Sequence, residues 1–515
     1  MTLPLALMVL PLLGAALVML LPASRRQLAK VATLVVSLAT LGLAVALAVR
    51  FEPEGERFQF VTDWEWIPSI GSSFSLGVDG VALALILMTA LLFPVVVLAS
   101  WHEAEPSGRS VKGYFALLLS LLALVMGVFL ATDVLLFYVF FEVMLVPMYF
   151  LIGAYGGQQR QYAAMKFFLY SLLGGLLMLA AVIGLFVAGN AELPGSTGTF
   201  SLATLSELSL DPGVQKALFL GFFVAFAIKA PLVPFHTWLP SAAAEAPIGV
   251  AVLLVGVLDK VGTYGMLRFL LALFPDASEY FAPMVIVLSL VGIFYGALLA
   301  IGQVDLKRLV AYTSIAHFGF ITLGIFVFTS QGGTGSVTYM VNHAFATGAL
   351  FLAVGLMIAR RGSRLVGDFG GLAKAAPLIA GVTMVAGMAS LALPGTGSFV
   401  SEFLVLQGTF TTDRVVAVIA TLGIILAAVY VLWMIQRTLM GPMNPKLSGV
   451  RDLGLREAFA VVPLMVLIIA IGVYPQPILD TVTPSVEATL SDMGQSDPPP
   501  VVVGDADAQG TESTP

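Results

Sequence analysis

The chain has 515 residues, of which 59% are hydrophobic and only 10% are charged, with a formal net charge of −6. A soluble protein carries roughly 25% charged residues, so this composition indicates a chain that is almost entirely membrane domain. Cysteine is absent, which excludes disulfides, thiol catalysis and Cys-ligated iron–sulfur or zinc sites. No basic patch with interleaved aromatic residues occurs, so nucleic acid is not an expected partner.

Long apolar runs divide the chain into about fourteen segments, each near the roughly 20 residues that a helix needs to cross a bilayer. We therefore predict an all-α polytopic membrane protein with about 14 transmembrane helices. In chain order the predicted spans are residues 3–22, 28–49, 78–100, 113–131, 134–154, 162–189, 216–234, 247–272, 281–302, 307–330, 336–359, 376–410, 414–439 and 457–477.

The positions of the basic residues predict the direction of these spans. Most of the 24 lysines and arginines fall in loops that follow odd-numbered spans. Cytoplasmic loops carry such an excess of positive charge. The pattern predicts a multi-pass membrane protein with both termini on the outer or periplasmic side.

Three segments do not fit a span. Residues 51–77 alternate apolar and polar side chains around Trp64 and Trp66, which predicts a short β-hairpin on the outer face. Residues 235–246 are too polar to span, and we expect them to lie along the inner interface. Residues 491–515 are rich in Pro, Asp, Gly and Ser and are expected to form a disordered acidic tail.

Two of the spans should be broken near mid-membrane. The seventh contains Pro231 and Pro234, and the twelfth contains Pro394 and Gly395. Proline removes a backbone donor and clashes with the preceding turn. Broken helices at corresponding positions of two halves indicate an inverted repeat with its site at the midplane. Helices 4–8 and 9–13 would form two inverted five-helix repeats.

This symmetry suggests a division of the chain into five parts. They are residues 1–112 with helices 1–3 and the hairpin, 113–274 as the first inverted repeat, 275–440 as the second inverted repeat, 441–490 with helix 14 and its flanks, and 491–515 as the tail.

Four charged residues stand out deep inside the predicted spans or next to their breaks: Glu142, Lys229, Lys260 and Glu402. A charge at the centre of a membrane helix costs several kcal/mol and by default marks an ion or proton path. Buried lysine gives up its proton readily, which suits Lys229 and Lys260 to proton storage. Tyr264 lies one turn after Lys260 and could hydrogen-bond to it, whereas adjacent Asp259 is expected to point elsewhere.

Two interpretations of Glu142 remain open. It is either a protonated carboxyl hydrogen-bonded to a neighbouring helix, or the partner of Lys229 in an ion pair whose opening releases the lysine proton. An unpaired lysine in the membrane would be very costly, which favours the ion pair. Glu402 has two compatible interpretations, a cap at the start of the second half-helix and the last titratable group of the row.

His317 and His343 are the only histidines inside predicted spans, and they lie on consecutive helices. A lone buried histidine is commonly a satisfied core residue, but two between Lys260 and Glu402 suit a proton relay. No HExxH motif or supporting carboxylate pattern surrounds them, so a metal site is not expected. The chain also contains no nucleotide-binding fingerprint, and no bound cofactor is expected in it.

Several linked motifs resemble the antiporter-like membrane subunits of respiratory complex I, a family shared with the large subunits of Mrp-type sodium/proton antiporters. Glutamate rather than the commoner lysine in the twelfth helix is similar to the M-type branch of that family. The motifs are FEVMLVPMYFLIG (141–153), KAPLVPFHTWLPSAAAEAP (229–247), LLVGVLDKVGTYGMLRF (253–269), QVDLKRLVAYTSIAHFGF (303–320) and LPGTGSFVSEF (393–403).

The resemblance implies a proton-pumping module of NADH:quinone oxidoreductase with a Glu142–Lys229 pair, Lys260 as central carrier, His317 and His343 as connectors, and Glu402 at the outlet. Ser401 stands where glycine is common in the family. FMN, iron–sulfur clusters and quinone would belong to partner subunits. The expected partners are L-type and N-type antiporter-like neighbours, small K- and J-type subunits, and the lipid bilayer.

Two alternatives remain. The chain could be a subunit of an Mrp-type cation/proton antiporter, which would show sodium-dependent exchange. It could also be a non-conducting structural spacer of the membrane arm, although the full set of membrane charges argues against that interpretation.

Overall fold

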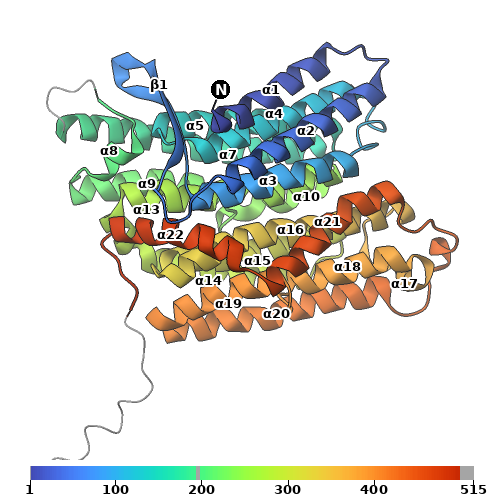
Figure 1. Cartoon of the computed structure of the whole chain (residues 1–515). Coiled ribbons are helices and arrows are strands. Elements are labelled where there is room, and N and C mark those ends of the chain that lie inside the picture. The colour runs from blue at the N-terminus through green and yellow to red at the C-terminus, as the bar shows by residue number, and fades with distance from the viewer. Residues whose placement is uncertain (1, 193–197, 499–515) are drawn as a thin grey trace, which may run out of the picture.

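A computed structural model of the chain describes residues 2–192 and 198–498. Figure 1 shows the helices packed side by side, with most axes roughly parallel, in one bundle. Among the described residues, thirteen helices are long and apolar enough to cross a membrane. The prediction of an all-α polytopic membrane protein is confirmed.

The first half of the bundle begins with three helices and continues to the segment around Lys260. Its main helices are α1 (Leu3–Leu20), α2 (Arg26–Val49), α3 (Gly80–Ala99), α4 (Val111–Leu130), α5 (Val134–Val143), α6 (Leu145–Tyr155), α7 (Arg160–Glu192), α9 (Pro212–Lys229), α11 (Ile248–Leu253), α12 (Lys260–Gly265) and α13 (Leu271–Leu273). Short helices α8 (Leu202–Ser206), η2 (Phe235–Trp238) and α10 (Leu239–Glu245) connect them.

The second half is formed by α14 (Pro275–Ile301), α15 (Leu306–Phe326), α16 (Ser330–Arg361), α18 (Pro377–Ser390), α19 (Gly397–Thr412), α20 (Arg414–Leu439), α21 (Leu455–Val473) and α22 (Gln476–Asp492). Short helices η5 (Val366–Asp368), α17 (Leu372–Ala375) and η6 (Pro445–Leu447) lie in its connections. Helices α15, α16 and the run Ile248–Leu273 are buried along most of their length, whereas only 28% of the residues in the most apolar stretches of α2, α20 and α21 are buried. This is the burial expected when outer helices face lipid and inner helices carry the site.

Polar caps fix where several helices begin. Asp79 accepts a hydrogen bond from the Ala82 amide at the start of α3, and Asp133 accepts one from the Leu136 amide at the start of α5, both at 2.8 Å. Such caps satisfy amides that have no partner within the helix. Asp79 and Asp133 are therefore the N-caps of these two helices.

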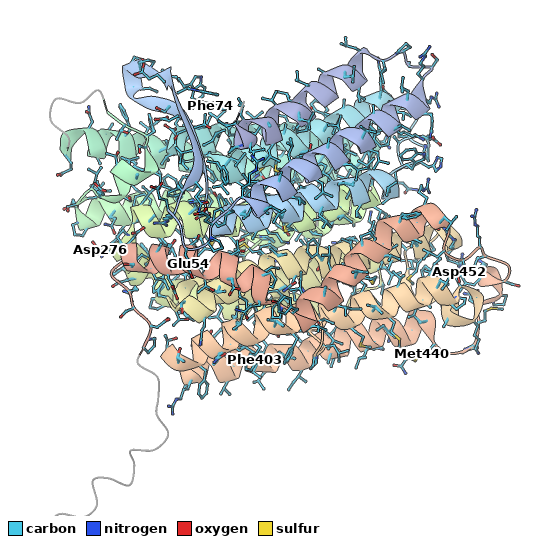
Figure 2. All side chains as sticks on the ribbon, viewed as in Figure 1. Glu54, Phe74, Asp276, Phe403, Met440 and Asp452 are labelled. Carbon is cyan, nitrogen blue, oxygen red and sulfur yellow. The ribbon has the colours of Figure 1, made fainter. Side chains whose placement is uncertain are left out.

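The predicted hairpin is also confirmed. Strand β1 (Gln59–Ile67) pairs antiparallel with β2 (Ser72–Val78) through the 3-10 turn η1 (Pro68–Ile70), in a register that places Trp64 opposite Phe74. Their rings stack with centroids 6.0 Å apart. Figure 1 shows the hairpin beside α8, and we call this the hairpin end of the bundle. In Figure 2 the labelled Asp276 lies at the hairpin end and Asp452 lies at the opposite end.

Both predicted breaks occur. Helix α9 ends at Lys229, just before Pro231, and the twelfth span consists of the two half-helices α18 and α19. The link between the half-helices contains Ala392 and Gly395 with positive φ angles of 58° and 92°. The inverted-repeat relation of helices 4–8 and 9–13, and the five-part division built on it, stay predictions.

Residues 235–246 form no span, as predicted; η2 and α10 are largely buried, and α10 packs against α7 and α15. One expectation about irregular segments needs correction. The chain after the last span is not a simple flank, because α22 continues to Asp492 and Asp497 accepts hydrogen bonds from Ser330. Polar residues and two prolines concealed this helix in the sequence; the rest of the predicted tail, residues 499–515, lies outside the described residues.

Arg268 is buried near the hairpin end of the bundle. Its guanidinium donates to Asp79 at 2.6 Å and to the Tyr264 hydroxyl at 3.0 Å, and it lies 4.7 Å from the centroid of the Phe58 ring. The cluster joins the Lys260 helix to the start of α3 and to the hairpin segment.

We predict that Arg268→Ala destabilises the fold by about 3–5 kcal/mol, because it leaves the Asp79 carboxylate buried without its counter-ion. The measurement is the amount of subunit retained in the assembled complex on a native gel as temperature rises. Exposed Arg50 is the matched control, and Arg50→Ala should leave the profile unchanged. Equal profiles for both variants would contradict the structural role of the cluster.

Candidate functional site

The charged residues predicted inside the membrane lie at interruptions of the helices. Lys229 is the last residue of α9, Lys260 follows a π-helical segment, and Glu402 lies in the half-helix α19. All three side chains are buried. Proline causes the first interruption, because neither Pro231 nor Pro234 can donate the amide that would continue α9.

The Glu142 carboxylate and the Lys229 ammonium carry opposite charges but make no direct contact. Within the described residues, Lys229 Nζ and Glu142 Oε1 have no hydrogen-bond partner, and no ion pair within 4.0 Å joins them. The Lys229 ammonium lies 4.8 Å from the centroid of the Phe141 ring and 5.8 Å from that of Phe167. The ring faces stabilise the cation. The predicted direct pair is therefore open in this structure.

Gly175 on α7 makes room for the Glu142 carboxylate. A Cβ atom at position 175 would overlap both carboxylate oxygens, whereas the neighbouring Gly174 packs against Ala225 and Ile228 of α9. Gly174 therefore permits close packing of α7 against α9, and Gly175 admits a charged side chain between α5 and α7.

Lys260 lies at the centre of a polar cluster. Its ammonium donates to the Val255 carbonyl and contacts His343 Nδ1, both at 2.5 Å, and the nearer Asp259 carboxylate oxygen is 3.1 Å away. Two π-helical segments, η3 (Leu254–Leu258) and η4 (Met266–Leu270), flank it. Such single π turns inside helices are frequent at functional sites.

Two expectations about Lys260 are wrong. Asp259 does not point elsewhere, because the lysine side chain folds back toward the N-terminal end of its helix and brings its ammonium beside the preceding carboxylate. Tyr264 does not bond Lys260, because its hydroxyl donates to the Phe129 carbonyl at 2.9 Å and accepts from Arg268.

His343 and His317 extend the row of polar groups that starts at Lys260. The ring centroids of His343 and His317 are 5.2 Å apart in an edge-to-face arrangement. His317 Nε2 lies 3.4 Å from the Tyr430 hydroxyl of α20. His343 Nδ1 contacts Lys260 and His317 Nε2 lies near Tyr430, whereas the other nitrogen of each imidazole has no hydrogen-bond partner among the described residues. The structure therefore brings together the predicted connectors.

Glu402 closes the row. The Tyr339 hydroxyl donates to its Oε2 at 3.1 Å, and the Tyr339 ring centroid lies 5.8 Å from that of His317. The capping interpretation of Glu402 is wrong, because α19 begins at Gly397 with Thr396 as the preceding residue, which places the carboxylate more than a turn inside. Asn342 instead holds the start of α19, donating to the Gly397 carbonyl at 2.7 Å.

Tyr339 and Tyr430 were missed by the sequence reasoning. A tyrosine in an apolar helix is typical of ordinary core packing. One signal was present: Tyr339 lies four residues before His343 and therefore on the same face of α16. No comparable signal marks Tyr430, which reaches the site only through the packing of α20.

Further buried polar atoms accompany the charges. Those without a hydrogen-bond partner among the described residues include Ser171 Oγ, Asn342 Oδ1, Thr347 Oγ1 and Ser390 Oγ. Native proteins leave few such groups unpaired, and ordered water commonly satisfies them. No group of three His, Asp or Glu side chains within residues 2–192 and 198–498 could hold a metal ion. The arrangement, titratable groups in series with hydroxyls between them, suits proton transfer.

Comparisons with known proteins agree with this architecture. The chain is 48% identical to "NADH-quinone oxidoreductase subunit M" of Mycobacterium tuberculosis, over 99% of this chain and 97% of that protein. It is 38% identical to "NADH-ubiquinone oxidoreductase chain 4" of Marchantia polymorpha, over 93% and 95% of the two chains.

Two solved structures share the fold. Respiratory complex I from Thermus thermophilus contains a chain that matches with a TM-score of 0.86 and 31% identity, over 96% of this chain and all of that one. A chain of the Mrp complex from Dietzia sp. DQ12-45-1b matches with a TM-score of 0.83, but at 24% identity this likeness concerns the fold alone. The family description of the NADH:quinone oxidoreductase/Mrp antiporter transmembrane region matches residues 131–427. The chain belongs to this family of antiporter-like membrane subunits.

Proposed function

We propose that this chain is the M-type subunit, the counterpart of mitochondrial chain 4, in the membrane arm of a proton-translocating NADH:quinone oxidoreductase. The observation that carries the proposal is the connected row Lys260–His343–His317–Tyr339–Glu402 in a chain whose relatives bear that name. The oxidoreductase activity belongs to the whole complex. In this proposal FMN, iron–sulfur clusters and quinone are held by partner subunits, and this chain moves protons.

The proposed cycle depends on two parts of the site. The Glu142–Lys229 pair is open, whereas the groups from Lys260 to Glu402 lie close together. Lys229 is held away from Glu142 over aromatic rings, so its proton is stabilised less than in a closed ion pair. Opening of the pair favours release of that proton toward Lys260. Lys260 then donates to His343 Nδ1, and the proton continues through His317 to Glu402. Quinone chemistry in the partner subunits would drive the opening electrostatically.

Asp259 would stabilise the protonated state of Lys260, at 3.1 Å from its ammonium. Tyr339 would orient Glu402 and stabilise its anionic form by donating a hydrogen bond to Oε2. A donor held toward a carboxylate favours the charged form of that carboxylate. The outlet would thus be kept ready to accept the next proton.

The antiporter alternative shares the fold, so the fold does not separate the two functions. The glutamate at position 402 and the names of the relatives favour the complex I subunit. A non-conducting spacer would not need Lys229, Lys260 and Glu402 buried together, since each buried charge costs free energy that packing alone would avoid.

The proposed setting is the bacterial cytoplasmic (inner) membrane, with both termini on the outer side and the hairpin end facing outward. The distribution of basic residues supports this direction. The proposed neighbours are L-type and N-type antiporter-like subunits together with small K- and J-type subunits.

The first prediction about pumping concerns Glu142→Gln. The neutral side chain interacts almost equally with charged and neutral Lys229, and about 1.4 kcal/mol of lost differential interaction is a tenfold effect, so we expect on the order of a tenfold loss of pumping. The measurement is NADH-driven acidification of inverted membrane vesicles, with assembly checked on a native gel. Exposed Glu207 supplies the control, Glu207→Gln. Intact NADH-driven pumping with a defect confined to sodium/proton exchange would favour the antiporter.

The second prediction concerns Tyr339→Phe, which removes one hydroxyl and keeps the ring. Loss of a hydrogen bond of about 1–1.5 kcal/mol to Glu402 should slow pumping roughly five- to tenfold without reducing assembly. The rate of NADH-driven acidification is measured in the same vesicles. Tyr280→Phe, at an exposed tyrosine, is the control. A wild-type rate of acidification in Tyr339→Phe would remove Tyr339 from the path.

The third prediction concerns Gly175→Ala. The new methyl group must displace the Glu142 carboxylate, and such overpacking costs about 1–3 kcal/mol, so pumping should fall although no charge is changed. Gly381→Ala is matched, because a Cβ at Gly381 meets nothing within 4 Å. If both variants pump equally well, the glycine does not position the carboxylate.

A further inference from the structure

Two adjoining cavities lie at the end of the bundle opposite the hairpin, between the end of α3, the end of α16 and the start of α21. Their volumes are about 260 Å³ and 520 Å³, and both are lined by His102, Arg456 and Glu457. Neither contains a residue of the charged row described above. They therefore require a separate explanation.

The smaller cavity is largely apolar. Leu98, Ile248, Leu352, Leu356 and Val461 contribute to its walls. These side chains come from four different helical segments, so the cavity is a crevice between helices. Its chemistry suits a hydrocarbon chain.

The larger cavity is basic and contains Arg360, Arg451, Arg456 and Trp101 in its walls. Glu457 neutralises Arg360 through contacts of 3.0 and 2.6 Å. In the described part of the chain no ion pair is formed by Arg451 or Arg456. Two guanidinium groups are therefore available for an anion, and guanidinium binds phosphate with paired hydrogen bonds.

The cavities lie at the depth where a membrane has its headgroups. The candidate spans Gly80–Ala99 and Ser330–Arg361 end here, and Leu455–Val473 begins here. Trp101 follows the first of them, and tryptophan is enriched at this level of a bilayer. Leu455 and Phe459 beside the cavities are 82% and 69% exposed, as expected of a flank that faces lipid.

We propose that the paired cavities bind one anionic phospholipid, with an acyl chain in the crevice between α3, α16 and α21 and the phosphate at Arg451 and Arg456. Charge complementarity selects an anionic lipid over a zwitterionic one, because two unpaired cations face the headgroup. The ligand joins the end of α16 to α3 and α21. Helix α16 also carries Tyr339 and His343, further toward its start. The proposal is independent of the function assigned to the charged row.

The test uses the complete complex in native membranes or nanodiscs. A phosphatidylglycerol with a photoactivatable group on its acyl chain is crosslinked, and labelled peptides are mapped. We expect labelling within residues 352–359 and 455–461, at least several-fold above that from a phosphatidylcholine with the same chains. The double variant Arg451→Gln/Arg456→Gln should lower the phosphatidylglycerol labelling by on the order of tenfold. Lys446→Gln, an exposed change in the same loop and outside both cavities, should not.

Each other outcome overturns the proposal. Equal labelling by both lipids, unchanged in the double variant, would mean ordinary contact with bulk lipid. Competition by excess inorganic phosphate with no effect of chain length would identify a phosphate site rather than a lipid site. Absence of labelling in the assembled wild-type complex would mean that another subunit covers the cavities. Native-gel assembly of the double variant separates a binding defect from misfolding.

Discussion

A charged side chain inside a bilayer must be stabilised by the protein itself, because the hydrocarbon offers neither water nor counter-ions. The structure meets this constraint in three different ways. Aromatic ring faces surround Lys229, a carboxylate and a carbonyl hold Lys260, and a tyrosine hydroxyl reaches Glu402. The helix breaks, the π-helical segments and the small residue at position 175 all serve to bring these groups into place.

Irregular backbone therefore occurs where the charges are. Broken and π-helical segments free carbonyls and amides that a regular helix would use internally, and membrane proteins tolerate this only where the backbone is buried in protein. The unbroken α16 provides the contrasting element, with Tyr339, Asn342 and His343 along a continuous 32-residue helix. Because α16 is continuous, it holds its side chains of the row at a fixed spacing. The interrupted helices beside it supply the backbone groups that a regular helix would use internally.

The sequence was sufficient for the features that single residues determine. Prolines located both breaks, isolated charges located the row, and alternation with two tryptophans located the hairpin. It was insufficient wherever side-chain packing decides the contact. Asp259 meets Lys260 only because the lysine folds back, Tyr430 arrives from a distant helix, and Arg268 is buried only because Asp79 lies opposite. The open state of Glu142 and Lys229 likewise depends on how the rings of Phe141 and Phe167 are placed.

The unequal spacing along the row has a kinetic consequence. Between Lys260 and His343 and between Tyr339 and Glu402 the groups are in direct contact, at 2.5 Å and 3.1 Å. Between Glu142 and Lys229 the described residues provide no such contact, and His343 Nε2 and His317 Nδ1 also lack a hydrogen-bond partner there. In a series of transfers the flux is limited by the step with the greatest resistance. The contacting pairs would remain close to equilibrium at every turnover, and control of the current would reside at the gaps, of which the one between Glu142 and Lys229 responds directly to a change of local electric field.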